Sequence, residues 1–329
     1  MRGLGLRLVD AVKPYALQIV LLIGLWWGFS ATTPLFTGIS SVYAVVEGFA
    51  VLGLISVGLL VPVLAGELDL SVAAMAALAG GIAVRVAGLG LVPALAIATL
   101  AGLVIGAIQG GVLSRLGISS VVFTIGTMLG LQGLAFLVSD NAALPLEDFS
   151  VSDPLLNRWS FLSPSSLVAI AVFGLVWFLL ACTKIGREVY AFGGGRREAA
   201  AAGVSQLRVM VVAFAVCGGC AALAGAMASI KSGSSTPGGY TDLLLIAPAA
   251  ILVGGINLDG GRGTVINVVL GVAIISVVRS GLGFRGVESY IVDLAVGGLL
   301  LVFVVADFFI QRAAGQRSRA RTARRVLTG

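Results

Sequence analysis

Residues 42–65 read VYAVVEGFAVLGLISVGLLVPVLA, a run in which Glu47 is the only charged side chain. A helix of roughly 20 apolar residues crosses the ~30 Å hydrocarbon core of a bilayer, so this stretch predicts a membrane span. The whole chain shares this character, because hydrophobic types make up 58% of its 329 residues and charged types 11%. A soluble domain has about 25% charged residues. The composition therefore excludes a soluble enzyme, and also a disordered chain, which needs high charge.

Apolar runs of this kind are spread along the whole sequence. They are continuous, whereas the strands of an outer-membrane barrel alternate apolar and polar residues in segments of about ten. We therefore expect an all-α polytopic membrane protein with about ten transmembrane helices. The expected spans are 16–33, 42–65, 71–87, 92–113, 120–138, 165–182, 208–230, 243–257, 263–282 and 289–310.

The spans divide the chain into an N-terminal segment, 1–15, a transmembrane domain, 16–310, and a basic tail, 311–329. The basic N-terminus resembles that of a signal peptide, but no small-residue cleavage site closes a short apolar region, so we expect a retained first helix. The segments 71–84 and 243–256 are short for a span. Because one lies in each half, they indicate broken helices and a weak two-half pseudo-repeat.

The distribution of Lys and Arg predicts the orientation. With ten spans and the N-terminus inside, sixteen of the 21 Lys and Arg residues lie in cytoplasmic segments or in the tail. The five outside are Arg85, Arg158, Lys231, Arg279 and Arg285. This bias follows the positive-inside rule, and it places both termini in the cytoplasm and the acidic loop 139–164 outside. We interpret the basic tail as an orientation signal that rests on anionic membrane lipid, not as a nucleic-acid site.

Charged side chains within apolar stretches are expensive and therefore point to function. Glu47, Asp293 and Asp307 lie within or at the end of expected spans. Two further carboxylates fall in a break between apolar stretches, AGELDLS at 65–71. A second break, GGINLDGGRG at 254–263, lies next to the other short segment.

Paired interruptions in two halves are typical of a transport path built from broken helices. Two tight glycine-rich turns on the cytoplasmic side are an equally open alternative. The candidate residues are Gly66, Glu67, Asp69 and Ser71 in the first break, and Gly254, Gly255, Asn257, Gly260, Gly261, Arg262 and Gly263 in the second. We expect Asp69 to cap the helix that follows it rather than to contact substrate.

The longest cytoplasmic insert between spans covers 183–207. It predicts a hinge at Gly193-Gly194-Gly195 and a short helix over 196–202 that stops at Gly203. Such a charged helix, lying parallel to the membrane surface, could be gripped by a soluble partner. The glycines do not form a phosphate loop, because no GKS or GKT follows and no strand precedes them. We therefore expect no nucleotide site in this chain, so ATP-driven work would need another subunit.

The residue types argue against catalysis. The chain has no histidine, which is the commonest general base and metal ligand, and we expect no catalytic residue, metal site or cofactor. Cys217-Gly-Gly-Cys220 has the spacing of a redox or metal pair. Small-residue packing is the favoured interpretation, because no flanking charge would lower a thiol pKa. Gly106 and Gly110 form a GxxxG pattern that predicts close helix packing.

Three segments give the chain a resemblance to a known family. They are AGELDLSV at 65–72, GREVYAFGG at 186–194 with the alanine pair and glycine that follow, and AILVGG at 250–255 with GGRGT at 260–264. In this order and spacing they resemble the membrane permease of bacterial monosaccharide ABC importers of the ribose, xylose and galactose type. The chain departs from the family pattern at Glu67, Ala73, Gly195 and Asn257.

The resemblance implies a multi-pass transporter subunit in the cytoplasmic (inner) membrane of a bacterium. Two copies of the chain, or this chain with a paralogous permease, would form the translocation path. Two copies of a cytoplasmic ATP-binding subunit would lie below it and an extracytoplasmic sugar-binding protein above it, with ATP used by the partner subunits. Coupling to the ATPase subunit would fall on Gly186, Arg187, Tyr190, Gly193, Glu198, Ala199, Ala200 and Gly203.

Two other functions compete with this one. An ion-coupled secondary transporter of small polar solutes needs ionisable groups at mid-membrane, for which Glu47, Asp69 and Asp293 are the candidates. That function would leave the insert 183–207 unexplained. A membrane enzyme would need catalytic groups clustered at one face. The identity of the sugar and the residues that contact it stay open.

Overall fold

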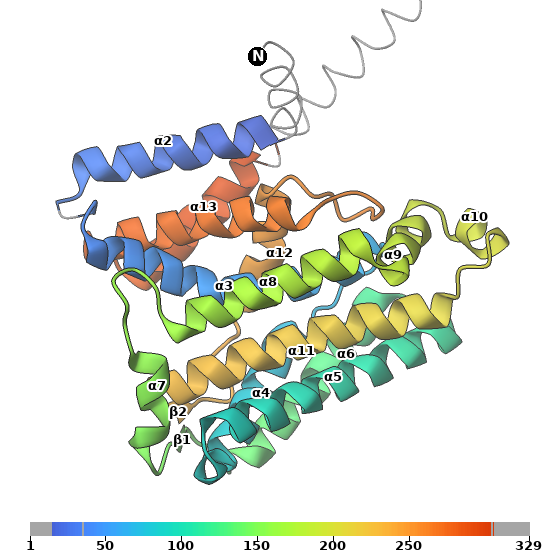
Figure 1. The fold of residues 1–329 in the computed structure, drawn as a ribbon, viewed down its shortest axis with the longest axis horizontal. Coiled ribbons are helices and arrows are strands. Elements are labelled where there is room, and N and C mark those ends of the chain that lie inside the picture. Colours follow the sequence, from blue (N-terminus) through green and yellow to red (C-terminus); the bar gives the residue numbers. More distant parts are fainter. Residues whose placement is uncertain (1–14, 35, 304, 306–329) are drawn as a thin grey trace, which may run out of the picture.

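The computed structural model describes residues 15–303 and residue 305, except for residue 35. Most of the N-terminal segment 1–15, Asp307 at the end of the last expected span, and the tail 311–329 lie outside the described residues. The described chain is a bundle of α-helices with one pair of very short strands (Figure 1).

Within the described residues, six helices are long and apolar enough to cross a membrane. They are α3 (Ile39–Leu64), α5 (Leu91–Leu116), α6 (Ser120–Val138), α8 (Pro164–Cys182), α11 (Gln206–Ser232) and α13 (Val265–Gly283). Four apolar helices are shorter, namely α2 (Ala16–Thr32), α4 (Val72–Arg85), α12 (Leu243–Val253) and Ser289–Phe303. Each of the ten expected spans overlaps one of these helices, the last of them over 289–303, but four of the helices are too short to establish ten crossings. The all-α membrane fold is therefore confirmed, and six crossings are supported by length and composition.

Helix α11 lies at the centre of the bundle and packs on α3, α4 and α5 (Figure 1). Its close approach to α5 depends on glycine. A methyl group at Gly106 would overlap the carbonyl oxygen of Phe214, and one at Gly110 would overlap that of Met210. Such close approach strengthens van der Waals contact between helices in lipid. The GxxxG prediction is confirmed, and Gly102, one turn earlier, extends the same face.

The outer faces of α5, α6 and α8 carry exposed apolar side chains. Leu100 on α5, Leu129 and Leu137 on α6, and Leu175 on α8 are each at least 60% exposed. A surface of this kind marks contact with a membrane or with another protein. It is the surface that an integral membrane subunit presents to lipid and to its neighbours.

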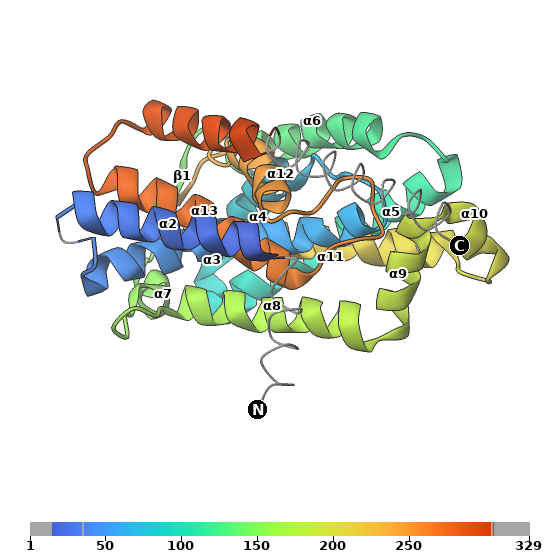
Figure 2. The same cartoon turned by 90° about the horizontal axis from the view of Figure 1, so that it is seen from above.

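The two ends of the bundle carry different structures. At one end β1 (Leu144–Pro145) pairs antiparallel with β2 (Ser234–Ser235), and η3 (Phe149–Ser152) and α7 (Asp153–Leu156) follow β1. The short η2 (Ala87–Leu89) joins α4 to α5. At the opposite end α9 (Lys184–Gly194) and α10 (Arg196–Ala201) project beyond α8 (Figures 1 and 2). The loop 139–164 and the insert 183–207 therefore lie at opposite ends of the bundle.

Candidate functional site

Both glycine-rich breaks and the end of α9 meet at one place. The Gly261 amide donates a hydrogen bond of 2.8 Å to the carbonyl oxygen of Leu64, the last residue of α3. Gly193 lies against both, because a methyl group there would overlap the Leu64 oxygen and lie 2.7 Å from the Gly261 nitrogen. A methyl group at Gly260 would lie 2.7 Å from the Cα of Gly66. The three motifs, far apart in the sequence, thus form one contact made of backbone.

The backbone angles at the breaks explain why these positions are glycine. Gly66 in the first break has φ +75°. In the second break, φ is +87° at Gly255, +87° at Gly260, +70° at Gly261 and +135° at Gly263. Side chains other than glycine reach this region only at a cost. The chain therefore has the sharp turns expected at both breaks.

The expected hinge over 193–195 is wrong in its extent. Helix α9 continues through Gly193 and Gly194, and the helical segment is interrupted at Gly195 alone. Gly193 allows close approach to the end of α3, as described above. Gly186 serves similarly, because a methyl group there would overlap the carbonyl oxygen of Leu180. Both glycines lie inside α9 and let its backbone approach neighbouring helices closely, Gly193 at the end of α3 and Gly186 at the end of α8. Neither of them bends α9.

Two side chains tie this segment to the breaks. Arg196 Nη2 lies 2.5 Å from Oε1 of the mostly buried Glu67 side chain and 3.4 Å from the carbonyl oxygen of Gly66. The Tyr190 hydroxyl donates a hydrogen bond of 2.8 Å to the carbonyl oxygen of Gly263. Arg196 is not among the site residues predicted from the sequence. The only sequence feature that pointed to such a cation was Glu67, an acidic residue at a position where the family pattern has no acidic residue. A buried carboxylate needs a cation as its partner.

Helix α9 is anchored to the bundle through Glu188, which is buried. Its Oε1 lies 3.4 Å from Arg208 Nη1 of α11 and 3.6 Å from Lys184 Nζ. The Thr183 hydroxyl caps the start of α9 by accepting a hydrogen bond from the Gly186 amide. The beginning of α9 is therefore fixed to α8 and α11, while its end touches the breaks.

The exposed face of α9 and α10 is narrower than expected. Arg187, Glu198 and Ala200 are exposed, whereas Ala199 is buried. Of the two alanines at which coupling to an ATPase subunit is expected, only Ala200 is accessible, because Ala199 packs inward. Gly203 has φ +81° just beyond α10, so this helix stops where the sequence predicted.

The first break runs into the bundle beside α6. The Leu68 amide donates a hydrogen bond of 3.2 Å to Ser120 Oγ, and the Leu70 amide donates one of 3.1 Å to Thr124 Oγ1. Backbone donors at membrane depth need such partners within the protein, because lipid offers none. The first break is thus irregular backbone embedded in the bundle and not a simple surface turn.

Asp69 is buried at the end of this segment. Its Oδ1 accepts hydrogen bonds from the Ser71 amide (2.8 Å) and the Ser71 hydroxyl (2.6 Å). Ser71 is the N-cap residue of α4, and no side chain caps the amides of the first turn of that helix. Asp69 therefore binds the N-cap residue itself and does not cap the helix in the way expected. Gln109 of α5 donates to Ser71 Oγ over 3.1 Å and to Thr127 Oγ1 over 2.9 Å. The sequence analysis missed Gln109, a lone amide in an apolar run.

The second break is held at its start by polar side chains of two helices. The carbonyl oxygen of Gly254 accepts hydrogen bonds from Asn267 Nδ2 of α13 (2.7 Å) and Gln18 Nε2 of α2 (3.2 Å). Thr264 and Asn267 form a reciprocal capping box at the start of α13. These bonds satisfy backbone groups that the turn leaves free.

A cavity of about 890 Å³ borders the second break at the same end of the bundle. Gly193 of α9 lines it together with Asn257, Asp259 and Arg262. Asn257 Nδ2 donates to Asp259 Oδ2 over 2.6 Å, and the Arg262 side chain is exposed. The cavity is therefore polar, and α9 forms one of its walls.

The carboxylates considered for ion coupling all have protein partners. Glu47 Oε1 lies 2.6 Å from Lys231 Nζ, and Asp293 Oδ1 lies 3.7 Å from Arg279 Nη2. Asp69 is hydrogen-bonded to Ser71, as described above. Their contacts are those of structural groups, which weakens the case for an ion-coupled transporter.

The CxxC pair packs as small side chains on α11. Cys217 and Cys220 are buried and free. A methyl group at Gly58 of α3 would lie 2.5 Å from the Cys220 Cβ, so α3 and α11 are in close contact there. This agrees with the interpretation of the cysteines as packing residues.

The family of the chain follows from comparison with known proteins. Residues 41–305 match a family model described as Branched-chain amino acid transport system / permease component. Relatives include the ribose import permease protein RbsC of Escherichia coli strain K12, which is 27% identical over 84% of this chain and 88% of its own length. The D-allose transport system permease protein AlsC of the same strain is 29% identical over 79% and 80%. The L-arabinose ABC transporter permease protein AraH of Azospirillum brasilense is 30% identical over 88% and 86%.

No solved structure gives a significant match. The family model covers most of the chain, and the relatives match it over most of their own length. The resemblance inferred from the three motifs is thereby confirmed, and the chain belongs to this family of transport-system permease components.

Proposed function

We propose that this permease carries a monosaccharide or a similar polar solute through the membrane as part of an ABC importer. The relatives are named for ribose, allose and arabinose, all of which are small, polar, uncharged sugars. Their identities to this chain lie between 27% and 30%, so none of the three sugars is favoured. The proposal is therefore for a substrate class.

The contact among Gly193, Leu64 and Gly261 carries the proposal. Helix α9, which is exposed at one end of the bundle, touches both breaks through the backbone atoms of Gly193. Close-packed atoms transmit a displacement because there is no free volume to absorb it. Movement of α9 by a partner subunit would therefore displace both breaks together. This is the behaviour required of a permease driven from outside its own chain.

The partners follow from the two ends of the bundle. Two copies of an ATP-binding subunit would supply ATP hydrolysis, one of them docking on the exposed Arg187, Glu198 and Ala200 of this chain. An extracytoplasmic sugar-binding protein would approach the end that carries the loop 139–164. A second copy of this chain, or a paralogous permease, would complete the path. The Lys and Arg distribution supports cytoplasmic termini in a bacterial inner membrane.

Uptake of a panel of labelled monosaccharides tests the proposal. The chain would be expressed, in cells that lack their own sugar permeases, with the ATPase and the secreted binding protein from neighbouring reading frames. We expect uptake of at least one sugar, lost when the ATP-binding lysine of the ATPase is replaced. Uptake that persists without the ATPase and collapses with a protonophore would instead favour the ion-coupled alternative.

A further inference from the structure

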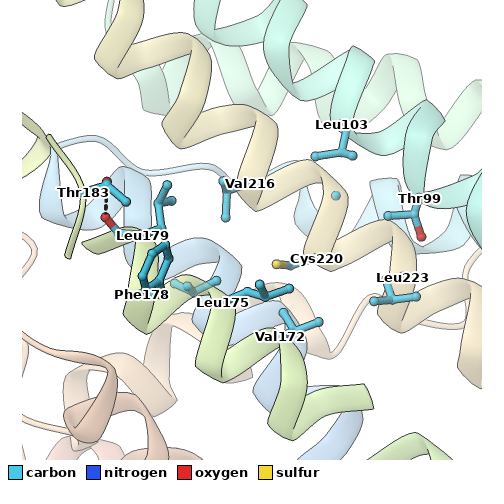
Figure 3. A pocket seen from close by; sticks show the side chains of 12 residues that line it. Thr99, Leu103, Val172, Leu175, Phe178, Leu179, Thr183, Val216, Cys220 and Leu223 are labelled. Atoms are coloured by element: carbon cyan, nitrogen blue, oxygen red, sulfur yellow. Dashed lines mark hydrogen bonds between the residues drawn. The ribbon is translucent and has the colours of Figure 1, made fainter. Parts of the chain in front are cut away.

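An apolar groove separates α8 from α5 and α11. Its volume is about 400 Å³. Leu175 and Phe178 line it from α8, Leu103 from α5 and Cys220 from α11 (Figure 3). Gly219 of α11 also lines it. Gly219 lets Leu103 of α5 pack directly on α11 at the groove, because a methyl group at Gly219 would lie 2.6 Å from Leu103 Cδ2.

The groove has the length of one leaflet of a bilayer. Its lining on α8 runs from Val172 to Thr183, where α8 ends and α9 begins (Figure 3). Eleven helical steps of ~1.5 Å give about 16 Å, and half of a hydrocarbon core is ~15 Å. A groove that starts at the end of a span and stops near mid-membrane fits one acyl chain of the adjoining leaflet.

Positive charge gathers at the α9 end of the groove. Lys184 follows Thr183 directly, and its side chain is 77% exposed. Lys184 and Arg208 both approach the same oxygen of Glu188, at 3.6 Å and 3.4 Å. One carboxylate thus faces two cations, which leaves a positive charge at the membrane boundary. A lipid phosphate complements such a charge.

We propose that the groove binds one anionic phospholipid, with an acyl chain between α8 and α11 and its phosphate at Lys184. With the orientation proposed above, the lipid belongs to the inner leaflet. It lies behind the junction of α8 and α9, so its acyl chain supports the base of the helix that touches both breaks. The lipid is therefore part of the structure that positions α9.

Native mass spectrometry of the purified full-length chain tests the site, with phosphatidylglycerol and phosphatidylcholine of identical acyl chains as probes. We expect one phosphatidylglycerol to stay bound after other lipids are stripped, and at least fivefold less phosphatidylcholine. Leu103→Trp fills the groove and Lys184→Glu reverses the charge at its mouth. Each should lower retention at least fivefold. Leu100→Trp, on the same helix outside the groove lining, and Arg115→Glu, at the end of α5, are the matched controls and should retain the lipid.

A second measurement needs no variant. Phosphatidylglycerol should raise the unfolding temperature of the delipidated chain more than phosphatidylcholine does, and the difference should shrink at high salt because the phosphate contact is screened. Equal retention of the two lipids, or equal loss in the groove and control variants, would overturn the site. Both readouts measure lipid binding alone, so they stand whether or not the chain transports a sugar.

Discussion

The Gly261 amide donates its hydrogen bond to the carbonyl oxygen of Leu64 over 2.8 Å, and Gly193 of α9 lies against both residues. Leu64 ends α3, and its carbonyl has no partner further along that helix. An orphan carbonyl at a helix end normally turns to water or to a capping group. Here it binds the second break instead, so the two breaks are joined to each other as well as to α9. A displacement of α9 would therefore reach both at once.

The ion pair between Arg196 and Glu67 should support this coupling. Glu67→Arg and Arg196→Glu each place like charges together, so each should reduce uptake per folded permease. The double exchange should restore much of it. The Arg196 side chain is half exposed but that of Glu67 is mostly buried, so each single variant should also be less stable, because it leaves a buried charge without its partner. Sugar uptake, normalised to permease in the membrane, is the measurement.

Arg197→Glu is the matched control for the ion pair, since Arg197 is an exposed neighbour in α10. It should leave uptake close to that of the parent chain. If the double exchange transports no better than the worse single variant, the pair does not act as a unit.

Asp69 should act through its hydrogen bonds rather than its charge. Asp69→Asn keeps an oxygen that can accept from the Ser71 amide and hydroxyl, so most uptake should remain. Asp69→Leu leaves these buried donors unpaired at a cost of about 1–3 kcal/mol, so folded permease and uptake should both fall. Loss of uptake in Asp69→Asn at normal expression would point to substrate or ion binding by the charge.

Ala200 should lie in the interface with the ATP-binding subunit. Ala200→Asp adds a charged side chain to the exposed surface of α10 without touching the core. It should uncouple ATP hydrolysis from uptake while the permease stays in the membrane. The same change at Ala142, exposed in the loop at the opposite end, is the control. Unchanged coupling in Ala200→Asp would place the docking surface elsewhere.

Reporter fusions should detect the proposed orientation. A reporter active only outside the cytoplasm should be active when fused after Ser152 and inactive when fused after Gly329. Activity at both positions, or at neither, would contradict the arrangement of ten spans with both termini inside.

The helices could be predicted from sequence, but the contact between the breaks could not. Apolar runs predicted the positions of the apolar helices, including the six that are long enough to cross a membrane, because lipid demands apolar side chains over a fixed length. The glycines of the breaks could also be found locally, because they stand where the apolar runs are interrupted. Their joint contact with Gly193 depends on which backbones approach, and neither periodicity nor spacing records that.

Long-range polar partners were missed for a related reason. Glu67 pairs with a residue more than a hundred positions away, and Gln109 meets Ser71 from another helix. The two breaks also differ, because the short helix α4 follows the first break whereas the short helix α12 precedes the second. This order was already visible in the sequence, where the segment 71–84 follows its break and the segment 243–256 precedes its own.

A comparison of two adjacent glycines tests the central claim most directly. Gly193→Ala places a methyl group against the Leu64 carbonyl, whereas the same change at Gly194 meets nothing within 4 Å. Overpacking of this kind typically costs ~1–3 kcal/mol. Because the cost falls on the contact that couples α9 to the breaks, ATP-driven sugar uptake per folded permease should fall about fivefold or more in Gly193→Ala. It should stay near the parent value in Gly194→Ala. Equal uptake in the two variants would contradict coupling through this contact.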